Sequence, residues 1–419
     1  MTSAGSWLAA LRRSTYRRVW TVFGLQQFGY WFSSIAFQWL VARETDSDPL
    51  ILSLLYFSIL LPMLLVSLPA GVLADTHDRR RIVLVAQVAI LVISCTTAAL
   101  VLLDHAPVPV LMACGFAVGT AHTLQQPATQ ALVVNAVPVE DLRSAVVLQS
   151  IAMNLARIAG PAMAGLLILA WGAVESLIAY GVIGLVALLV VSRIRNLPAR
   201  PWQPDRQSLV ARIGSGLRHT RTHPPAGIAL AIVGVTSLFA ISYLAQLPAV
   251  AKLASDNPAT FLLFTSVGGI GSLAGVLTVA ARPPATPGVT PPAAMLLALG
   301  TVVAALGVNR LLWLQCLLIG VGGALQFGIM TLCNGVIQQV VDDDHRGRVM
   351  SLYLVCWGGL LPVGGLLLGT VWHLVGPLAA LTVNGCVAMA FALWVLRPGA
   401  TRTAPLPRDP AASVPASAT

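Results

Sequence analysis

Hydrophobic residues in this chain occur in twelve long stretches, which short polar segments separate. An α-helix needs about 20 residues to cross a hydrocarbon core of about 30 Å, and most of the stretches reach that length. The pattern predicts membrane-spanning helices at residues 19–41, 50–73, 82–103, 110–134, 144–170, 173–192, 227–251, 260–281, 293–308, 311–337, 348–373 and 377–396. We therefore expect an all-α integral membrane protein with about twelve transmembrane helices.

A polar segment rich in Arg and Pro divides these helices into two sets of six. It predicts an N-terminal six-helix bundle at 1–192, a basic cytoplasmic linker at 193–226, a C-terminal six-helix bundle at 227–396 and a disordered cytoplasmic tail at 397–419. The halves are similar locally, because Glu140-Asp-Leu-Arg143 precedes the fifth helix and Asp343-Asp-His-Arg346 the eleventh. Many secondary transporters are built from two such repeats around a site near the bilayer midplane. We expect two pseudo-symmetric bundles.

The charge distribution predicts the orientation in the membrane. Hydrophobic residues make up 57% of the chain, charged residues only 10%, and the net charge is +10. Arg43, Lys252 and Arg310 are the only Lys and Arg residues in the expected external loops, and Arg157 lies inside a span. The remaining Lys and Arg residues face the other side, which places both termini in the cytoplasm. This asymmetry favours anionic lipid headgroups as partners over nucleic acid.

The loop between the second and third spans carries a specific motif. It reads Gly71-Val-Leu-Ala-Asp75-Thr-His-Asp78-Arg79-Arg80. A glycine at this position lets its helix approach a partner helix closely, and Asp75 is suited to face a helix N-terminus. The loop resembles the signature of the major facilitator superfamily, G-x-L-x-D-x-x-G-R-[KR], with Asp78 in place of the second glycine. The resemblance implies the two-bundle major facilitator fold.

The same resemblance implies a conformational latch at the cytoplasmic side. We expect Asp75 to meet the start of the eleventh helix near Gly347 to Met350, with Arg346 or Arg348 as further partners. The corresponding loop of the second half, at residues 281–288, lacks the motif. The latch is therefore expected to be built mainly from one side.

The fifth helix contains a second motif, Asn154-Leu-Ala-Arg157-Ile-Ala-Gly160-Pro161-Ala-Met-Ala-Gly165. Gly-Pro permits a bend, and small residues let a neighbouring helix pack closely. The pattern resembles the superfamily's antiporter motif, although an ordinary kinked, tightly packed helix has the same features. Together with the loop motif and Gln126-Pro127, it is similar to the enterobactin-exporter and macrolide-efflux branch.

Polar residues at membrane depth are the candidates for a substrate or coupling site, because they are costly there without partners. Arg157 is the only clear charge inside a span, and Asn154 shares its helix face. The remaining candidates lie on four other helices: His122 and Gln126 on the fourth, Gln27, Tyr30 and Gln38 on the first, Tyr243 and Gln246 on the seventh, and Gln326 on the tenth. Each stripe is also compatible with hydrogen bonding between packed helices.

These features predict a secondary transporter that exports a small organic molecule, such as a siderophore, drug or other natural product, by alternating access. The resemblance implies proton antiport, but no Asp or Glu lies deep in a span. His122 has a suitable titration range, although a packing role fits it as well. No cofactor, metal ligand set or nucleotide-binding loop is visible.

We expect the chain to act as a monomer in a bacterial plasma membrane. An importer on the same fold is the main alternative. An integral-membrane enzyme is a second alternative, but it requires a cluster of catalytic groups that the sequence does not show.

The topology is testable by cysteine labelling. In a background without native cysteines, an impermeant thiol reagent added to intact cells should modify Ser47→Cys, in an expected external loop, and not Ser208→Cys, in the expected cytoplasmic linker. Labelling of Ser208→Cys in intact cells would overturn this orientation.

Overall fold

The computed structural model describes residues 9–194, 214, 218, 220, 223–282, 288–342, 349–350 and 352–397. Every regular element in these ranges is helical. Residues 398–419 of the expected tail and most of the expected linker lie outside the described residues.

The first half contains six long helices. They are α1 (Ser14–Glu44), α2 (Pro49–Thr76), α3 (Arg79–Leu102), α4 (Val108–Asn135), α5 (Leu142–Ala170) and α6 (Ala173–Ser192), with short 3-10 segments η1 (Ala9–Arg12) and η2 (Val139–Asp141).

The second half contains six further helical segments, two of which are interrupted. Its elements are α8 (Pro224–Val235), η3 (Thr236–Ala240), η4 (Ser242–Gln246), α9 (Leu247–Ala254), α10 (Ala259–Ala281), α11 (Thr290–Val308), α12 (Leu312–Val340), η5 (Val355–Gly359), α14 (Leu360–Val375) and α15 (Pro377–Leu396). The expected all-α membrane fold is confirmed, and each expected span corresponds to a helical segment with ends within a few residues.

Local chemistry explains several helix starts. Asp48 caps α2, because its Oδ1 accepts from the backbone N–H groups of Leu50 and Ile51 at 2.8 and 3.0 Å, and Pro49 follows it. Asp78 caps α3 by accepting from the N–H of Arg80 at 2.9 Å. Gly376, with φ of 86°, makes the tight turn into α15 that a side chain disfavours.

Eleven helical segments within the described ranges are long and apolar enough to cross a membrane, and α1 is not among them. It is 31 residues long but carries many polar side chains. The whole run from Phe32 to Gln38 is buried, because α2, α4, α5 and α6 surround the helix. Protein rather than lipid covers the polar residues of this run, Ser33, Ser34 and Gln38, so this part of the helix does not need an apolar surface.

Two segments of the second half depart from the continuous helices that the sequence predicts. The segment 224–254 contains the π-helical η3 and the 3-10 η4, and the segment 352–375 contains the π-helical η5. Backbone N–H groups of Ile241 and Leu360 donate to residues five positions earlier. Such widened turns place side chains out of the regular helical register and recur at functional sites.

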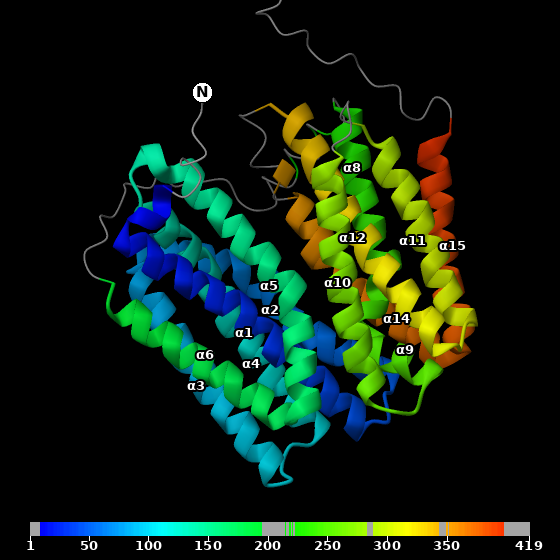
Figure 1. The fold of residues 1–419 in the computed structure, drawn as a ribbon, viewed down its shortest axis with the longest axis horizontal. Helices are drawn as coiled ribbons and strands as arrows, with labels where there is room; N and C mark the ends of the chain where they lie inside the picture. The colour runs from blue at the N-terminus through cyan, green and yellow to red at the C-terminus, as the bar shows by residue number, and fades with distance from the viewer. Residues whose placement is uncertain are drawn as a thin grey trace, which may run out of the picture.

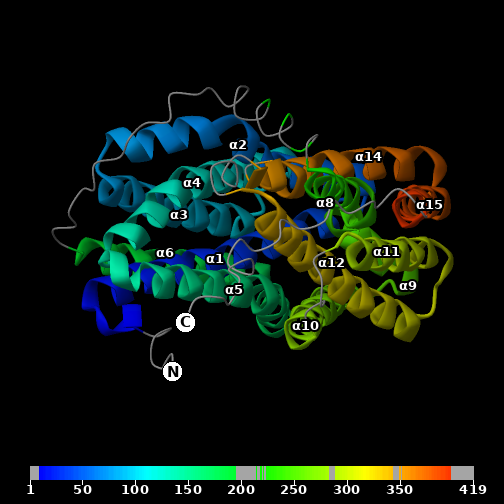
Figure 2. The same cartoon turned by 90° about the horizontal axis from the view of Figure 1, so that it is seen from above.

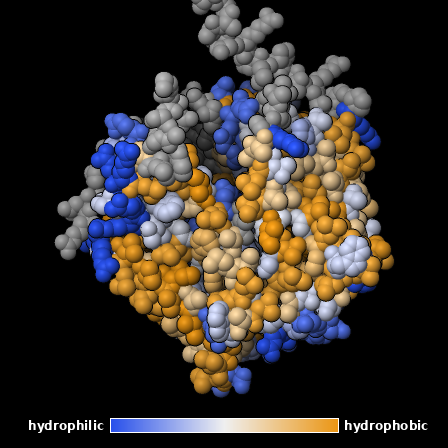
Figure 3. All heavy atoms as spheres, in the orientation of Figure 1, coloured by the Kyte–Doolittle hydropathy of each residue, from blue (hydrophilic) through white to orange (hydrophobic). Residues whose placement is uncertain are grey.

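The helices form two groups that lie side by side (Figures 1 and 2). Helices α1–α6 contact mainly one another, and α8–α15 do the same. Hydrophobic residues cover much of the side surface, and hydrophilic residues gather toward its upper and lower edges (Figure 3). This is the surface that a bilayer requires.

The two bundles meet mainly at one end of the molecule, the lower one in Figure 1, which we name the Asp46 end. The opposite end carries Arg12–Arg18, Arg79–Arg81 and Arg193, and we name it the arginine-rich end. The broadest contacts between the bundles join α5 to α10 and α2 to α14. Helices α5 and α10 converge toward the Asp46 end (Figure 1).

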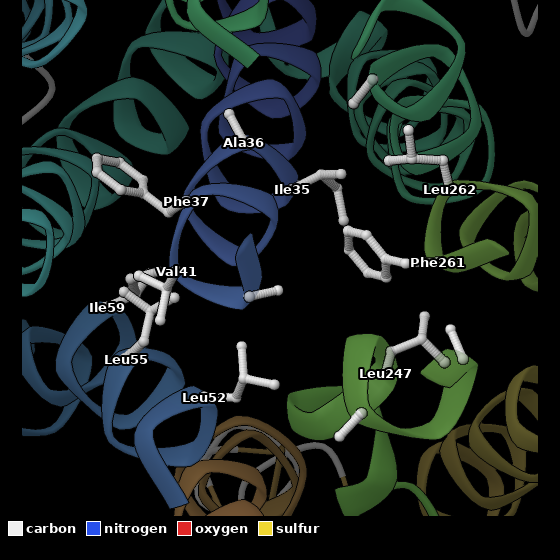
Figure 4. Close-up of a cluster of buried hydrophobic side chains, with 14 of the residues drawn as sticks. Ile35, Ala36, Phe37, Val41, Leu52, Leu55, Ile59, Leu247, Phe261 and Leu262 are labelled. Atoms are coloured by element: carbon white, nitrogen blue, oxygen red, sulfur yellow. The ribbon is translucent and has the colours of Figure 1, made fainter. Parts of the chain in front are cut away.

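An apolar cluster crosses between the bundles at this end. In Figure 4, Ile35 of α1 points toward Phe261 of α10, and Leu52 of α2 faces Leu247 of α9. All four side chains are buried. Because hydrophobic association is weak between lipid-facing helices, close packing of this kind is a main source of cohesion.

Polar pairs rim the same end. Lys252 of α9 forms an ion pair with Asp46 and also donates to its backbone carbonyl at 3.1 Å. His373 of α14 lies 3.7 Å from Asp48 of α2, measured between Nδ1 and Oδ2. The Asp46 end is therefore closed by an apolar cluster inside a polar rim.

The closure depends on Gly369 of α14, which we expect to be intolerant of a side chain. A Cβ atom there would lie 2.7 Å from the carbonyl oxygen of Pro49 and 2.8 Å from Cβ of Ser53. Overpacking of this kind costs about 1–3 kcal/mol, so Gly369→Ala should open the Asp46 end and raise the labelling rate of a cysteine at Ala251 by about tenfold. Gly335→Ala, where a Cβ would have no atom within 4 Å, is the control. Equal labelling in the two variants would contradict this account.

Candidate functional site

Arg157 lies near the middle of α5, so about 20 Å of helix separates it from either end. Its guanidinium lies over two rings of the other bundle, 4.5 Å from the centroid of Trp357 and 5.7 Å from that of Phe327. It makes no hydrogen bond or ion pair with any residue that the structure describes. A cation at this depth is costly without a counter-charge, water or a ligand. The arrangement is therefore suited to binding an anion between the bundles.

Aromatic residues of α1 and α4 form a second cluster, which contacts α5 at Gly160. Tyr30 and His122 are in ring contact, with centroids 4.8 Å apart and planes tilted by 42°. Trp31 meets Tyr30 edge to face at 5.7 Å. Trp31 also occupies the space beside Gly160, where a Cβ would lie 2.6 Å from its Cδ1 atom. The structure thus brings together the predicted residues Tyr30 and His122 and gives Gly160 a packing role.

The other small residue of the fifth-helix motif contacts the second bundle. A Cβ at Gly165 would lie 3.2 Å from the carbonyl oxygen of Leu262 in α10. Pro161 lies inside α5, which remains one helix from Leu142 to Ala170. The motif therefore serves two close approaches, one within its own bundle and one across the bundle interface.

Several other candidate residues have hydrogen bonds or packing contacts of their own. Gln246 is fully buried, where its Nε2 donates to the carbonyl of Gly365 at 2.6 Å and to Oγ of Ser53 in the other bundle. Tyr243 is also buried, with its hydroxyl against α12. Asn154 donates to the carbonyl of Ser150 in its own helix at 2.8 Å. The structure places Gln246 in the contact between the bundles.

The glutamine residues differ in burial. Gln27 and Gln126 are partly exposed, whereas Gln38 and Gln326 are buried. The Oε1 atom of Gln38 has no hydrogen-bond partner among the described residues. Gln326 directly precedes Phe327 on α12.

A buried amide network lies beside the predicted Gln126. Oε1 of Gln125 accepts from Nε2 of Gln26 at 3.0 Å and from Nε2 of Gln87 at 2.8 Å, and all three residues are buried. The network joins α1, α3 and α4. The sequence indicates polar residues on this helix but does not show which of the two adjacent glutamines points inward.

Three aromatic residues near Arg157 are not among the sequence candidates. They are Trp357 and Phe327, already described, and Tyr353, whose hydroxyl donates to the carbonyl of Met330 at 3.2 Å. Their side chains are compatible with ordinary apolar spans. The only sequence signal is that Trp357 directly precedes Gly358-Gly359.

The loop arginines hold the arginine-rich end of the first bundle together. Nε of Arg79 donates to the carbonyl of Ala74 at 3.0 Å. Arg80 donates to the carbonyls of Val191 and Ser192 at the end of α6, at 3.2 and 2.6 Å. Asp78 forms an ion pair with Arg81 at 3.5 Å. These contacts give the motif a role within its own bundle.

The expected latch itself is not described. Arg346, Arg348 and the side chain of Asp75 lie outside what the structure describes. A Cβ at Gly71 would have no neighbour within 4 Å in this arrangement. The contact of Asp75 with the eleventh helix stays a prediction.

Comparison with known proteins identifies the class to which this arrangement belongs. Residues 5–413 match the model of a family described as transmembrane secretion effector. The staphyloferrin A transporter of Staphylococcus aureus is 23% identical over 395 residues, covering 87% of this chain and 92% of that protein.

Solved transporters share the fold. A POT family transporter in complex with 5-aminolevulinic acid aligns with a TM-score of 0.69 at 13% identity, covering 92% of this chain and 96% of that one. An inward-facing bacterial homologue of the lysosomal transporter Spinster aligns with a TM-score of 0.68 at 12% identity, covering 90% and 95%.

The two-bundle helical fold and these similarities define a multi-pass membrane transporter of the major facilitator type, not an enzyme. The chain belongs to the transmembrane secretion effector family.

The amide network gives a stability prediction. Gln125→Leu should lower the stability of the purified protein by about 1–2 kcal/mol, because two buried amide donors lose their acceptor. Thermal unfolding in detergent measures the effect, with Gln126→Leu as the partly exposed control. Equal loss of stability in both variants would show that the amide network makes no specific contribution to the stability of the protein.

Proposed function

We propose that this protein exports a small organic anion, or a molecule rich in hydrogen-bond acceptors, from the cytoplasm by alternating access. The observation that carries the proposal is the guanidinium of Arg157, which lies at mid-membrane between the bundles without a hydrogen bond or ion pair to a described residue. Because Arg presents a planar fork of donors, a carboxylate is a well-matched ligand.

The direction rests on orientation and on family. The positive-inside rule assigns the arginine-rich end to the cytoplasm. The bundles meet mainly at the Asp46 end, so in this arrangement the site is loaded from the cytoplasmic side. The secretion description of the family agrees with export. The staphyloferrin A transporter makes siderophores the first substrate class to test.

Proton antiport is the coupling that we propose. We assign the proton to the imidazole of His122, a titratable group that is in ring contact with Tyr30. Asn154, Gln27 and Gln126 are further candidates for substrate contact. We expect the monomer in a bacterial plasma membrane to be the functional unit.

The central test is transport by Arg157 variants in inside-out vesicles supplied with labelled staphyloferrin A and a proton gradient. Arg157→Gln should lower uptake per folded molecule by at least about tenfold, because a charge-assisted contact is lost. Arg157→Lys should also be impaired if the ligand binds the fork through two oxygens. Thermal unfolding of each variant separates loss of the site from loss of the fold.

Arg310→Gln is the matched control, because Arg310 lies at the Asp46 end and donates to the nearby carbonyls of Gly307 and Asn309, at 2.9 and 3.1 Å. Normal uptake by folded Arg157→Gln would mean that Arg157 is structural. Uptake into right-side-out vesicles instead would identify an importer.

A further inference from the structure

The two bundles touch at mid-membrane through the side chain of Arg157. The guanidinium comes from α5, whereas Trp357 and Phe327 come from η5 and α12. The contact therefore exists only while these elements of the two bundles lie together. Stacking of this kind contributes from about 0.5 kcal/mol to about 2 kcal/mol or more when water is excluded.

The stacking leaves the donors of Arg157 free. A ring over a guanidinium uses the flat face of the group, while its five N–H bonds point outward in the plane. No described residue accepts from them. The indole of Trp357 has no hydrogen-bond acceptor, so it holds the cation without competing with an anion for these N–H groups.

The backbone around Trp357 is seated on the first bundle. A Cβ at Gly358 would lie 2.9 Å from Cε of Met63, and one at Gly359 would lie 3.2 Å from Cδ2 of Leu64, both on α2. The absence of side chains at these glycines lets η5 lie against α2. The same five-residue π-helical segment thus sets the position of Trp357 relative to Arg157.

We infer that Trp357 is a positioning residue that links the affinity of the Arg157 site to the arrangement of the bundles. Separation of η5 from α2 and α5 removes Trp357 from the guanidinium, so the anion site is complete in the present arrangement and incomplete in the opposite one. An anion that binds the complete site then stabilises this arrangement, because a ligand shifts a population toward the state that it binds better.

This inference deepens the proposed function and rests on its anion-binding part. It also supplies a reason for release. A molecule that binds while the site is complete loses the guanidinium position set by Trp357 when the bundles rearrange. The affinity of the Arg157 site for that molecule therefore falls once the site opens to the other side.

The link between Arg157 and Trp357 can be measured without a substrate. Spin labels at Gln130→Cys on α4 and Gln339→Cys on α12, in a background without native cysteines, report the separation of the bundles toward the arginine-rich end. Arg157→Gln and Trp357→Leu should each lower the population of the present arrangement relative to the opposite one by about twofold to thirtyfold. The double variant should change it no more than either single variant.

Two further variants separate positioning from general packing. Trp357→Phe keeps a ring and should restore most of the population, whereas Trp313→Leu, which removes an exposed tryptophan elsewhere on α12, should have no effect. If Arg157→Gln does not fold, Arg157→Lys replaces it, because an ammonium lacks the flat face. Additive effects of the two substitutions, or unchanged distances, would overturn the inference.

The outcome is distinct from that of the transport test. Loss of uptake in Arg157→Gln, with additive effects of the Arg157 and Trp357 substitutions on the distances, would support the proposed anion site but overturn the positioning role of Trp357. Coupling together with normal uptake in folded Arg157→Gln would show an inter-bundle contact that does not serve anion binding, and would equally overturn the inference.

Discussion

The close approach of the two bundles at the Asp46 end is the contact on which the rest of the arrangement depends. It is made where side chains are small or absent, at Gly165 against Leu262 and at Gly369 against the start of α2. An apolar cluster fills the space around these crossings, and polar pairs rim it. Small residues are the usual means of such contact in membranes, where dispersion replaces the hydrophobic effect. By closing the Asp46 end, these crossings leave the central residues accessible from the arginine-rich end.

The same crossings bring a charge of one bundle against rings of the other. Arg157 is separated by about 20 Å of helix from either end of α5, too far for its side chain to reach the headgroups. Its contacts with Trp357 and Phe327 stabilise the cation partially but satisfy none of its hydrogen bonds. An arginine whose N–H groups have no partner among the described residues is costly at this depth, which is the observation behind the proposed anion site.

Several polar groups of the first bundle are, by contrast, paired. Gln125 accepts from two other glutamines, and Arg80 donates to the last carbonyls of α6. These contacts join α1, α3, α4 and α6 within the first bundle. The second bundle contains both π-helical segments, and η5 provides Trp357. The two bundles therefore contribute differently. The first carries the charge of Arg157, and the second supplies the ring of Trp357, whose position depends on the widened turn of η5.

The sequence by itself determined the helices, the fold class and the position of the central charge. Long apolar stretches have no alternative in a bilayer, since every backbone donor must be satisfied within its own helix. Arg157 was identifiable because an ionised group inside such a stretch is rare.

The tertiary structure alone decided which residues face which partner. It selected Gln125 over Gln126 for the buried network, placed Gln246 between the bundles and set Trp357 over Arg157. The inward-facing side of a helix depends on neighbours distant in sequence, and a π-helical turn shifts the register that periodicity assumes. The sequence does not reveal such a role for an aromatic residue, because within an apolar span the same side chain packs equally well against lipid, another helix or a cation.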